Sequence, residues 1–242
     1  MSDTLVIVPA FNEAERVGPV IEQILTANPA WHVLVVDDGS KDPTAAVARR
    51  AGAVVVSHPF NLGYGAALQT AYKYASERGY QYALQMDADG QHPPEEAAKL
   101  LVPITAGEVD MVIGSRFLEG GGGYKVPPAR RLGISLFGGL AGFISGESMS
   151  DVTSGFAAVG RRAILLFSGD RFPADYPDAD LRIMLHKVGL SVREVPVTMR
   201  AGPPGKSMHG GLLLPWYVVK MSISMLIVWI TRFDPVPEED ES

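Results

Sequence analysis

The stretch YALQMDADGQH, residues 82–92, decides the fold. Its first half, Tyr82–Met86, is an apolar run with the length of a buried strand, and two carboxylates, Asp87 and Asp89, follow it. Residues 5–13 and 32–40 show the same order of apolar run and polar loop, with amphipathic stretches between them. This alternation predicts a single α/β domain with a mostly parallel central sheet flanked by helices.

The predicted elements follow from the same periodicity. In a sheet of this kind the polar loops collect at the carboxyl ends of the strands, where ligands bind. We expect strands at Leu5–Val8, His32–Val36, Val54–Ser57, Tyr82–Met86, Met111–Gly114 and Val192–Met199, and helices at Glu13–Ala27, Pro43–Ala51, Gly63–Arg78 and Pro94–Ala106, with later helices starting near Ala129 and Asp178.

The composition of the chain excludes several classes of function. The formal net charge of −6 argues against a general nucleic-acid binder, because affinity for phosphate backbones comes from clustered Lys and Arg. The chain has no cysteine, which excludes disulfides, thiolate metal sites and a catalytic Cys. Its first residues lead directly into an apolar strand without the pattern of a signal peptide, so we expect a cytoplasmic protein.

Asp87 and Asp89 are the candidate metal ligands. A solvated acidic turn is the simpler interpretation of Asp-x-Asp, but two like charges at the end of an apolar strand favour a counter-cation. Mg²⁺ or Mn²⁺ accepts few protein carboxylates and completes its shell with substrate phosphates and water. Such a cation would neutralise the charge that develops on a departing nucleoside diphosphate.

Two other loops carry candidate nucleoside contacts. Asp38 follows an apolar strand and could accept hydrogen bonds from a base or ribose, although an Asx turn with a helix cap explains it equally well. Glu13 could bind ribose hydroxyls. The glycine-rich helix start at Asn61–Leu68 permits a dinucleotide-binding interpretation, but it lies far from the first strand and lacks the third glycine.

Several cations lie beside two glycine-rich segments. Each alone would be an ordinary surface residue, but together they predict a phosphate-binding rim in an acidic protein. The cations are Arg116, Arg130, Arg131, Arg200 and Lys206.

Asp180 lies near the start of an expected helix. It is explained by the helix dipole or by a role as general base for a hydroxyl acceptor. A phosphate acceptor, which is already ionised, would need no base.

Taken together, the motifs resemble inverting family 2 glycosyltransferases of the GT-A fold, particularly the dolichyl- or polyprenyl-phosphate mannose and glucose synthases. The resemblance spans Val8 to about Ser207. The matching blocks, in the family's order, are Val8–Glu13, Val36–Ser40, Asn61–Gly63, Asp87–His92, Gly114–Arg116, Asp151–Phe156 and Glu194–Val197.

The resemblance implies a set of roles and attack on the anomeric carbon with inversion. Tyr176–Asp180 departs from the usual pattern of the lipid-phosphate synthases, which puts the acceptor pocket in doubt. The implied nucleoside contacts are Pro9, Glu13 and Asp38; the metal ligands are Asp87, Asp89 and Gln91; the phosphate ligands are Arg116, Arg131, Arg200 and Lys206. We also expect nucleotide contacts at Ala10, Asp87 and Ala88, and catalytic residues at Asp89, Arg116 and Asp180.

The expected organisation is a GT-A domain at 1–211, an apolar helix at 212–232 and a disordered acidic tail at 233–242. The apolar helix could lie in a membrane interface or pack on the domain or on a second copy, since Lys220 makes spanning costly.

We therefore expect a hexose to move from a UDP-, GDP- or dTDP-sugar to a polyprenyl phosphate at the cytoplasmic membrane face. A sugar-hydroxyl acceptor in polysaccharide assembly, or a nucleotide-binding module without turnover, are the alternatives.

Overall fold

The computed structural model describes residues 3–122, 150–151, 154–170, 172, 179–200, 223–224, 226–233 and 236. The expected helix near Ala129 and two expected phosphate ligands, Arg131 and Lys206, lie outside these residues. So does most of the expected acidic tail.

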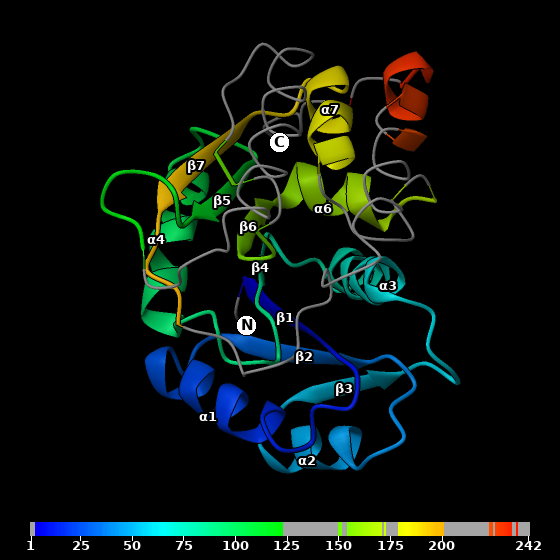
Figure 1. Cartoon of the computed structure of the whole chain (residues 1–242), viewed down its shortest axis with the longest axis vertical. Coiled ribbons are helices and arrows are strands. Elements are labelled where there is room, and N and C mark those ends of the chain that lie inside the picture. Colours follow the sequence, from blue (N-terminus) through cyan, green and yellow to red (C-terminus); the bar gives the residue numbers. More distant parts are fainter. Residues whose placement is uncertain are drawn as a thin grey trace, which may run out of the picture.

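A seven-stranded sheet forms the centre of the protein, in the order β3-β2-β1-β4-β6-β5-β7 (Figure 1). All neighbouring strands are parallel except at β6, which is antiparallel to both β4 and β5. The expected mostly parallel α/β fold is therefore confirmed. The strands are β1 (Thr4–Ala10), β2 (His32–Asp37), β3 (Val54–Ser57), β4 (Tyr82–Gln85), β5 (Met111–Ser115), β6 (Ala157–Gly160) and β7 (Val192–Pro196).

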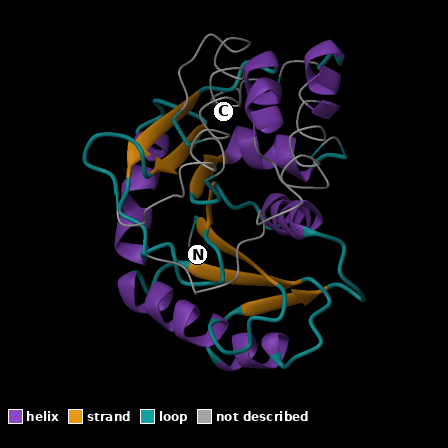
Figure 2. Cartoon of the chain, viewed as in Figure 1, coloured by secondary structure: helices purple, strands orange, loops and turns teal. Residues whose placement is uncertain are grey.

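The six helices labelled in Figure 1 lie on the two faces of this sheet. Side chains alternate along β1, so that Leu5 and Ile7 face one core while Val6 and Val8 face the other. The first core includes α3, α6 and α7, and the second includes α1 and α4 (Figure 2). The helices are α1 (Val17–Ala27), α2 (Thr44–Arg50), α3 (Tyr64–Glu77), α4 (Pro94–Thr105), α6 (Arg161–Ser168) and α7 (Ala179–Lys187).

The pair β6 and α6 was not predicted. The strand reads AAVG, and alanine and glycine have low β propensity, so the segment carries little strand signal. All four residues are buried between two longer strands, and this tertiary setting determines their conformation. The inserted antiparallel strand brings the residues just before it, 154–156, to the carboxyl end of β4.

Helix α1 begins at Val17 and not at Glu13, because the preceding backbone is held elsewhere. The amides of Asn12, Glu13 and Ala14 donate to side chains between the end of β2 and the start of α2, at 2.9, 2.9 and 3.1 Å. The turn at residues 14–16 ends in Arg16, whose φ of −118° departs from helical geometry, so the regular helix begins one residue later. The accepting side chains are those of Ser40, Thr44 and Asp42.

Part of the expected C-terminal helix is described. Residues 223–224 and 226–230 are helical, and Val228 packs against the core that contains α6 and α7. Lys187, at the end of α7, donates to the carbonyl oxygens of Val228, Trp229 and Thr231 at the end of this helix. Among the described residues, no helix combines the length and apolar character needed to cross a bilayer.

Candidate active site

Asp87 stands at the carboxyl end of β4, and its neighbours fix its carboxylate. The Tyr64 hydroxyl donates to Oδ1 of Asp87 at 3.0 Å and accepts from Nε2 of Gln85 at 2.9 Å. Burial raises the pKa of Asp87, and the nearby Asp89 adds to this, while His92 and Arg116 oppose it. The side chain is still 28% exposed, so its second oxygen, Oδ2, remains available to a ligand.

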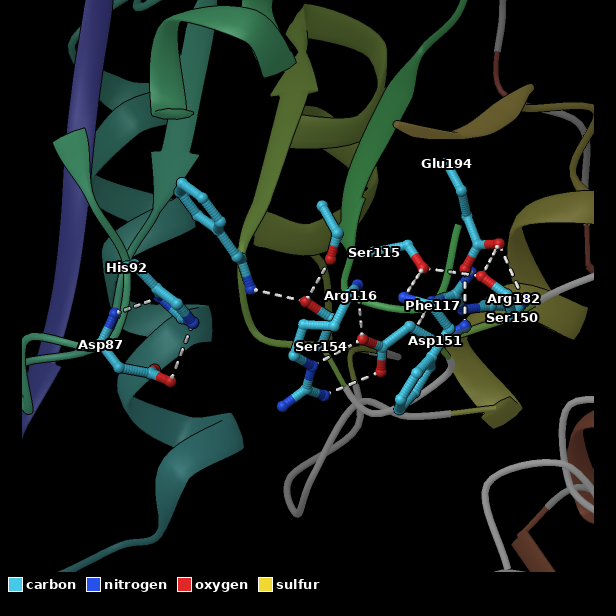
Figure 3. A network of polar contacts seen from close by, with 12 residues as sticks. Asp87, His92, Ser115, Arg116, Phe117, Ser150, Asp151, Ser154, Arg182 and Glu194 are labelled. Carbon is cyan, nitrogen blue, oxygen red and sulfur yellow. Dashed lines mark hydrogen bonds and ion pairs between the residues drawn. The ribbon is translucent and has the colours of Figure 1, made fainter. Parts of the chain in front are cut away.

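His92 shapes the loop that carries both carboxylates. Its ring is buried and stacks on Phe156, with ring centroids 4.6 Å apart. Nδ1 accepts the backbone N–H of Asp87 at 3.0 Å, so the proton of the neutral ring is assigned to Nε2, which lies 3.7 Å from Oδ2 of Asp87 (Figure 3). Burial lowers the pKa of His92, which keeps the ring neutral.

The carboxylate of Asp89 is held by Gln91, two residues further along the same loop. The backbone N–H of Gln91 donates to Oδ1 of Asp89 at 3.0 Å, and its side-chain amide donates to Oδ2. Among the described residues, no three His, Cys, Asp or Glu side chains gather closely enough to hold a metal ion. Two carboxylates on one loop fit Mg²⁺ or Mn²⁺, which binds through one or two carboxylates plus substrate phosphates.

Gly155 packs directly against the Asp87 carboxylate. A Cβ atom at that position would lie 2.9 Å from the Tyr64 hydroxyl oxygen and 3.3 Å from Oδ2 of Asp87. The backbone before β6 therefore forms one wall of the site, and only glycine allows this close approach.

The Asp38 carboxylate accepts hydrogen bonds from other residues of the protein. This buried carboxylate accepts from Nδ1 of His58 at 2.7 Å and from the amides of Leu62 and Gly63 at 2.8 and 2.9 Å. Gly39, at φ +70°, allows the backbone of Phe60 to approach within 2.4 Å of where its Cβ would lie. Two of the motifs therefore dock on each other, and the expected contact of Asp38 with a nucleoside stays a prediction.

The other expected nucleoside contacts line the neighbouring strand end. Pro9 and Ala10 are the last residues of β1, paired with Val36 and Asp37 of β2. Glu13 follows in the loop and accepts from Nη1 of Arg16 at 2.5 Å. Ala88, between the two candidate metal ligands, is buried. These residues are brought to one edge of the sheet, as the sequence predicted.

Arg116 follows β5 and is held by a carboxylate. Its Nε donates to Oδ2 of Asp151 at 2.8 Å, and its Nη2 donates to Oδ1 at 2.9 Å (Figure 3). The Asp151 side chain is fully buried and that of Arg116 is 9% exposed. Burial raises the pKa of Asp87 and lowers that of His92; the positive charge of Arg116 opposes the first shift and adds to the second, so the cation acts on the carboxylate loop.

Two further expected site residues, Arg200 and Asp180, lie within the described part of the chain. The guanidinium of Arg200 bonds to Gln23 at 2.6 Å and to Glu95 at 3.2 Å, while its backbone N–H donates to the carbonyl of Gln91. Asp180 belongs to α7, and its proposed role as a base stays a prediction.

Residues 5–166, from β1 to α6, match glycosyl transferase family 2. The chain belongs to this family. It is 35% identical over 222 residues to the polyprenol monophosphomannose synthase of Mycolicibacterium smegmatis, covering 86% of this chain and 81% of the relative. It is 32% identical over 218 residues to the undecaprenyl-phosphate mannosyltransferase of Micrococcus luteus, covering 86% and 88% of the two chains.

Solved structures agree on the fold. A glucosyl-3-phosphoglycerate synthase from Mycobacterium tuberculosis, in complex with Mn²⁺, uridine diphosphate and phosphoglyceric acid, superposes with a TM-score of 0.71 at 20% identity. The match covers 98% of this chain and 80% of that one. The protein is thus a GT-A glycosyltransferase, as the resemblance implied.

Four residues of the site in this glycosyltransferase have no role that the sequence predicts: Tyr64, His92, Asp151 and Gly155. Asp151 and Gly155 lie in a quoted family motif, but the motif alone does not show which side chains they meet. A partly buried tyrosine at a glycine-rich helix start also has no distinctive sequence signal. Most of these roles depend on contacts between distant segments, such as Tyr64–Asp87 across 23 residues and Arg116–Asp151 across 35.

Proposed function

We propose that this glycosyltransferase moves a hexose from a UDP-, GDP- or dTDP-sugar to a polyprenyl phosphate, with inversion and with Mg²⁺ or Mn²⁺. The observation that carries the proposal is the Asp87–Asp89 carboxylate loop with the fixed cation of Arg116 beside it. Carboxylates that can hold a divalent cation and an arginine that can bind phosphate suit a site built for phosphate groups.

Each part of the site has a task in this scheme. When bound, the cation would neutralise the charge that grows on the departing nucleoside diphosphate. Asp87, Asp89 and Gln91 would hold it, and the side-chain amide of Gln91 also orients Asp89. Arg116 would bind a phosphate oxygen. The carboxyl ends of β1, β2 and β4 and the loops that follow them would hold the nucleoside through Pro9, Ala10, Glu13, Asp38, Asp87 and Ala88.

A phosphate acceptor suits this site because it carries its negative charge at neutral pH. The acceptor oxygen can then attack the anomeric carbon without giving up a proton, and no general base is required. The names of the two relatives, a polyprenol monophosphomannose synthase and an undecaprenyl-phosphate mannosyltransferase, support the same acceptor class. Arg131, Arg200 and Lys206 are the further proposed phosphate ligands.

The exposed face of the helix at 223–230 supports a peripheral membrane contact. Ile223, Leu226, Ile227 and Ile230 follow helical spacing on one face, and each is more than half exposed. An apolar face of this kind can lie in the interface of a bilayer. We place the reaction at the cytoplasmic face, where nucleotide sugars are available.

The experiment is a transfer assay with UDP-, GDP- and dTDP-hexoses, Mn²⁺, and a short polyprenyl phosphate in detergent. Formation of a polyprenyl-phosphate hexose from one donor supports the proposal and identifies the sugar. Donor hydrolysis with transfer only to a sugar hydroxyl would refute the acceptor and favour Asp180 as a base. Nucleotide binding without either reaction would mean a module that lacks turnover.

A further inference from the structure

We propose that Asp151 is the positioning residue for Arg116, and that Glu194 fixes Asp151 in turn, so that Arg116 meets the diphosphate of the donor in one prepared orientation. This inference rests on the proposed function, which supplies the diphosphate. It assigns a task to three of the separate sequence motifs through a single set of contacts.

Two parallel hydrogen bonds join Arg116 to the Asp151 carboxylate. At 2.8 and 2.9 Å, they fix the plane of the guanidinium as well as its position. The backbone N–H of Arg116 also donates to Oδ2 of Asp151, at 3.3 Å. Since Nε and Nη2 are engaged, Nη1 is the terminal nitrogen that faces away from Asp151. In Figure 3 the guanidinium of Arg116 lies on the side of Asp151 toward Asp87 and His92.

A second set of contacts supports Asp151. The carboxylate of Glu194, on β7, accepts the backbone N–H of Ser150 and that of Asp151, both at 2.8 Å. The Ser150 hydroxyl donates to the same carboxylate at 2.9 Å. Nη2 of Arg182 donates to the carbonyl oxygen of Asp151 at 2.6 Å. The main chain on both sides of Asp151 is therefore held by charged groups.

These two sets of contacts contribute orientation more than stability. A buried ion pair is weak evidence for stability, because the desolvation of two charges offsets much of their attraction. Its benefit here is orientation, since an arginine that is free to rotate would lose rotamer entropy when it met a phosphate. Asp151 removes that freedom before the donor arrives.

The test is Asp151→Asn, compared with Arg116→Lys and with the double variant. The first readout is calorimetric binding of UDP and of GDP in the presence of Mn²⁺, which needs no acceptor; the second is the turnover number. Misplacing a reacting or binding group by about 1 Å can cost about 100-fold. We expect each single variant to lose about 10- to 100-fold in nucleotide affinity or turnover, on the scale of that positional effect.

The double variant separates positioning from a merely structural role. If Asp151 acts through Arg116, the double variant loses no more than Arg116→Lys alone. Losses that multiply would overturn the proposal, as would an Asp151→Asn enzyme with unchanged binding and turnover. Asp110→Asn is the matched control, because Asp110 pairs with Arg162 at 3.0 Å at the amino end of β5, the end opposite to Arg116. It should leave binding and turnover unchanged.

Two further outcomes are informative. If Asp151→Asn does not fold, Glu194→Gln tests the same chain of contacts, with a smaller loss that again does not multiply with Arg116→Lys. If the wild-type protein binds Mn²⁺ and nucleotide but transfers nothing to polyprenyl phosphate, the proposed function fails. The positioning proposal then stands or falls on the binding measurements alone.

Discussion

The Tyr64 hydroxyl donates to one oxygen of the Asp87 carboxylate at 3.0 Å, and this contact decides which oxygen faces the substrate. Tyr64 is partly buried at the start of α3, and desolvation of its hydroxyl raises its pKa well above the ordinary value, so it remains a hydrogen-bond donor. Oδ1 of Asp87 therefore accepts a hydrogen bond from the protein, while the contact described for Oδ2 is the more distant Nε2 of His92, at 3.7 Å, so Oδ2 is the oxygen that we expect to meet a cation. The candidate metal site depends on a residue from a different motif.

Tyr64→Phe should weaken Mn²⁺ binding while the fold is kept. The substitution removes one hydrogen bond to a charged group, worth about 1.5–3 kcal/mol, and so lets the carboxylate rotate. We expect the Mn²⁺ concentration for half-maximal activity to rise about 10-fold, on that scale. A titration of turnover against Mn²⁺ measures this shift.

Tyr72→Phe is the matched control. Tyr72 lies in the same helix and is fully buried, but its hydroxyl donates to Oε1 of Gln85, one contact further from the carboxylate. We expect little change in the Mn²⁺ titration of this variant. Equal shifts for the two variants would mean that Tyr64 acts only through general packing.

Gly155→Ala should abolish activity more completely than it affects stability. The added methyl group would meet both the Tyr64 hydroxyl and the Asp87 carboxylate, at 2.9 and 3.3 Å, and must displace one of them. Overpacking a tight site costs about 1–3 kcal/mol in stability. Turnover and thermal unfolding are measured together.

Gly160→Ala provides the comparison, because Gly160 lies at the other end of β6 and its Cβ would meet Ile104 at 3.1 Å. It should lower the melting temperature by a similar amount and leave turnover intact. If Gly160→Ala also abolishes turnover, the effect of Gly155→Ala reflects general damage to β6.

The sequence was sufficient for the frame of the molecule but not for the contacts between motifs. Periodicity predicted the strands of the first half because long apolar runs carry a strong signal. The short strand β6 was missed, since its four small residues take their conformation from the strands on either side. Asp87 and Asp89 were identified from their position after a strand. The partners of Asp87 and Arg116 come from distant segments, which only the folded chain brings together.

Asp38→Ala should lower both stability and nucleotide affinity. The carboxylate accepts three protein hydrogen bonds, and its loss leaves two backbone amides in the loop before α3 without their acceptor. An unsatisfied group that is fully buried costs about 1–3 kcal/mol, and these two hydrogen bonds are partly buried, so we expect a loss toward the lower end of that range. Chemical unfolding and UDP or GDP binding are measured on the same preparation. A fall in affinity with unchanged stability would instead mean that Asp38 acts mainly through direct contact with the nucleoside.

Asp89→Ala should abolish the Mn²⁺-dependent part of donor binding and leave the fold intact. Asp89 is proposed as a metal ligand, and its carboxylate bonds only within its own loop among the contacts described, to Gln91. Calorimetry with and without Mn²⁺, alongside circular dichroism, measures both effects. Unchanged donor affinity would refute the metal assignment.

Ile227→Asp should weaken binding to anionic liposomes, because it places a charge on the exposed apolar face of the C-terminal helix. Ile227 is 53% exposed. Val102→Asp is the control, since Val102 is 64% exposed but lies on α4. Liposome flotation measures the difference, and equal binding of both variants would count against the membrane contact. If the Ile227→Asp variant alone forms a smaller assembly in solution than the wild-type protein, the face joins two copies of the chain.

The most direct test of the central claim compares two acceptors that differ by one group: a short polyprenyl phosphate and the same polyprenol without its phosphate. Each is incubated with the active nucleotide sugar and Mn²⁺, and the lipid product is identified by mass spectrometry. We expect a polyprenyl-phosphate hexose from the first acceptor and no product from the second. Transfer to the free polyprenol, or to neither lipid while a sugar hydroxyl is glycosylated, would contradict it.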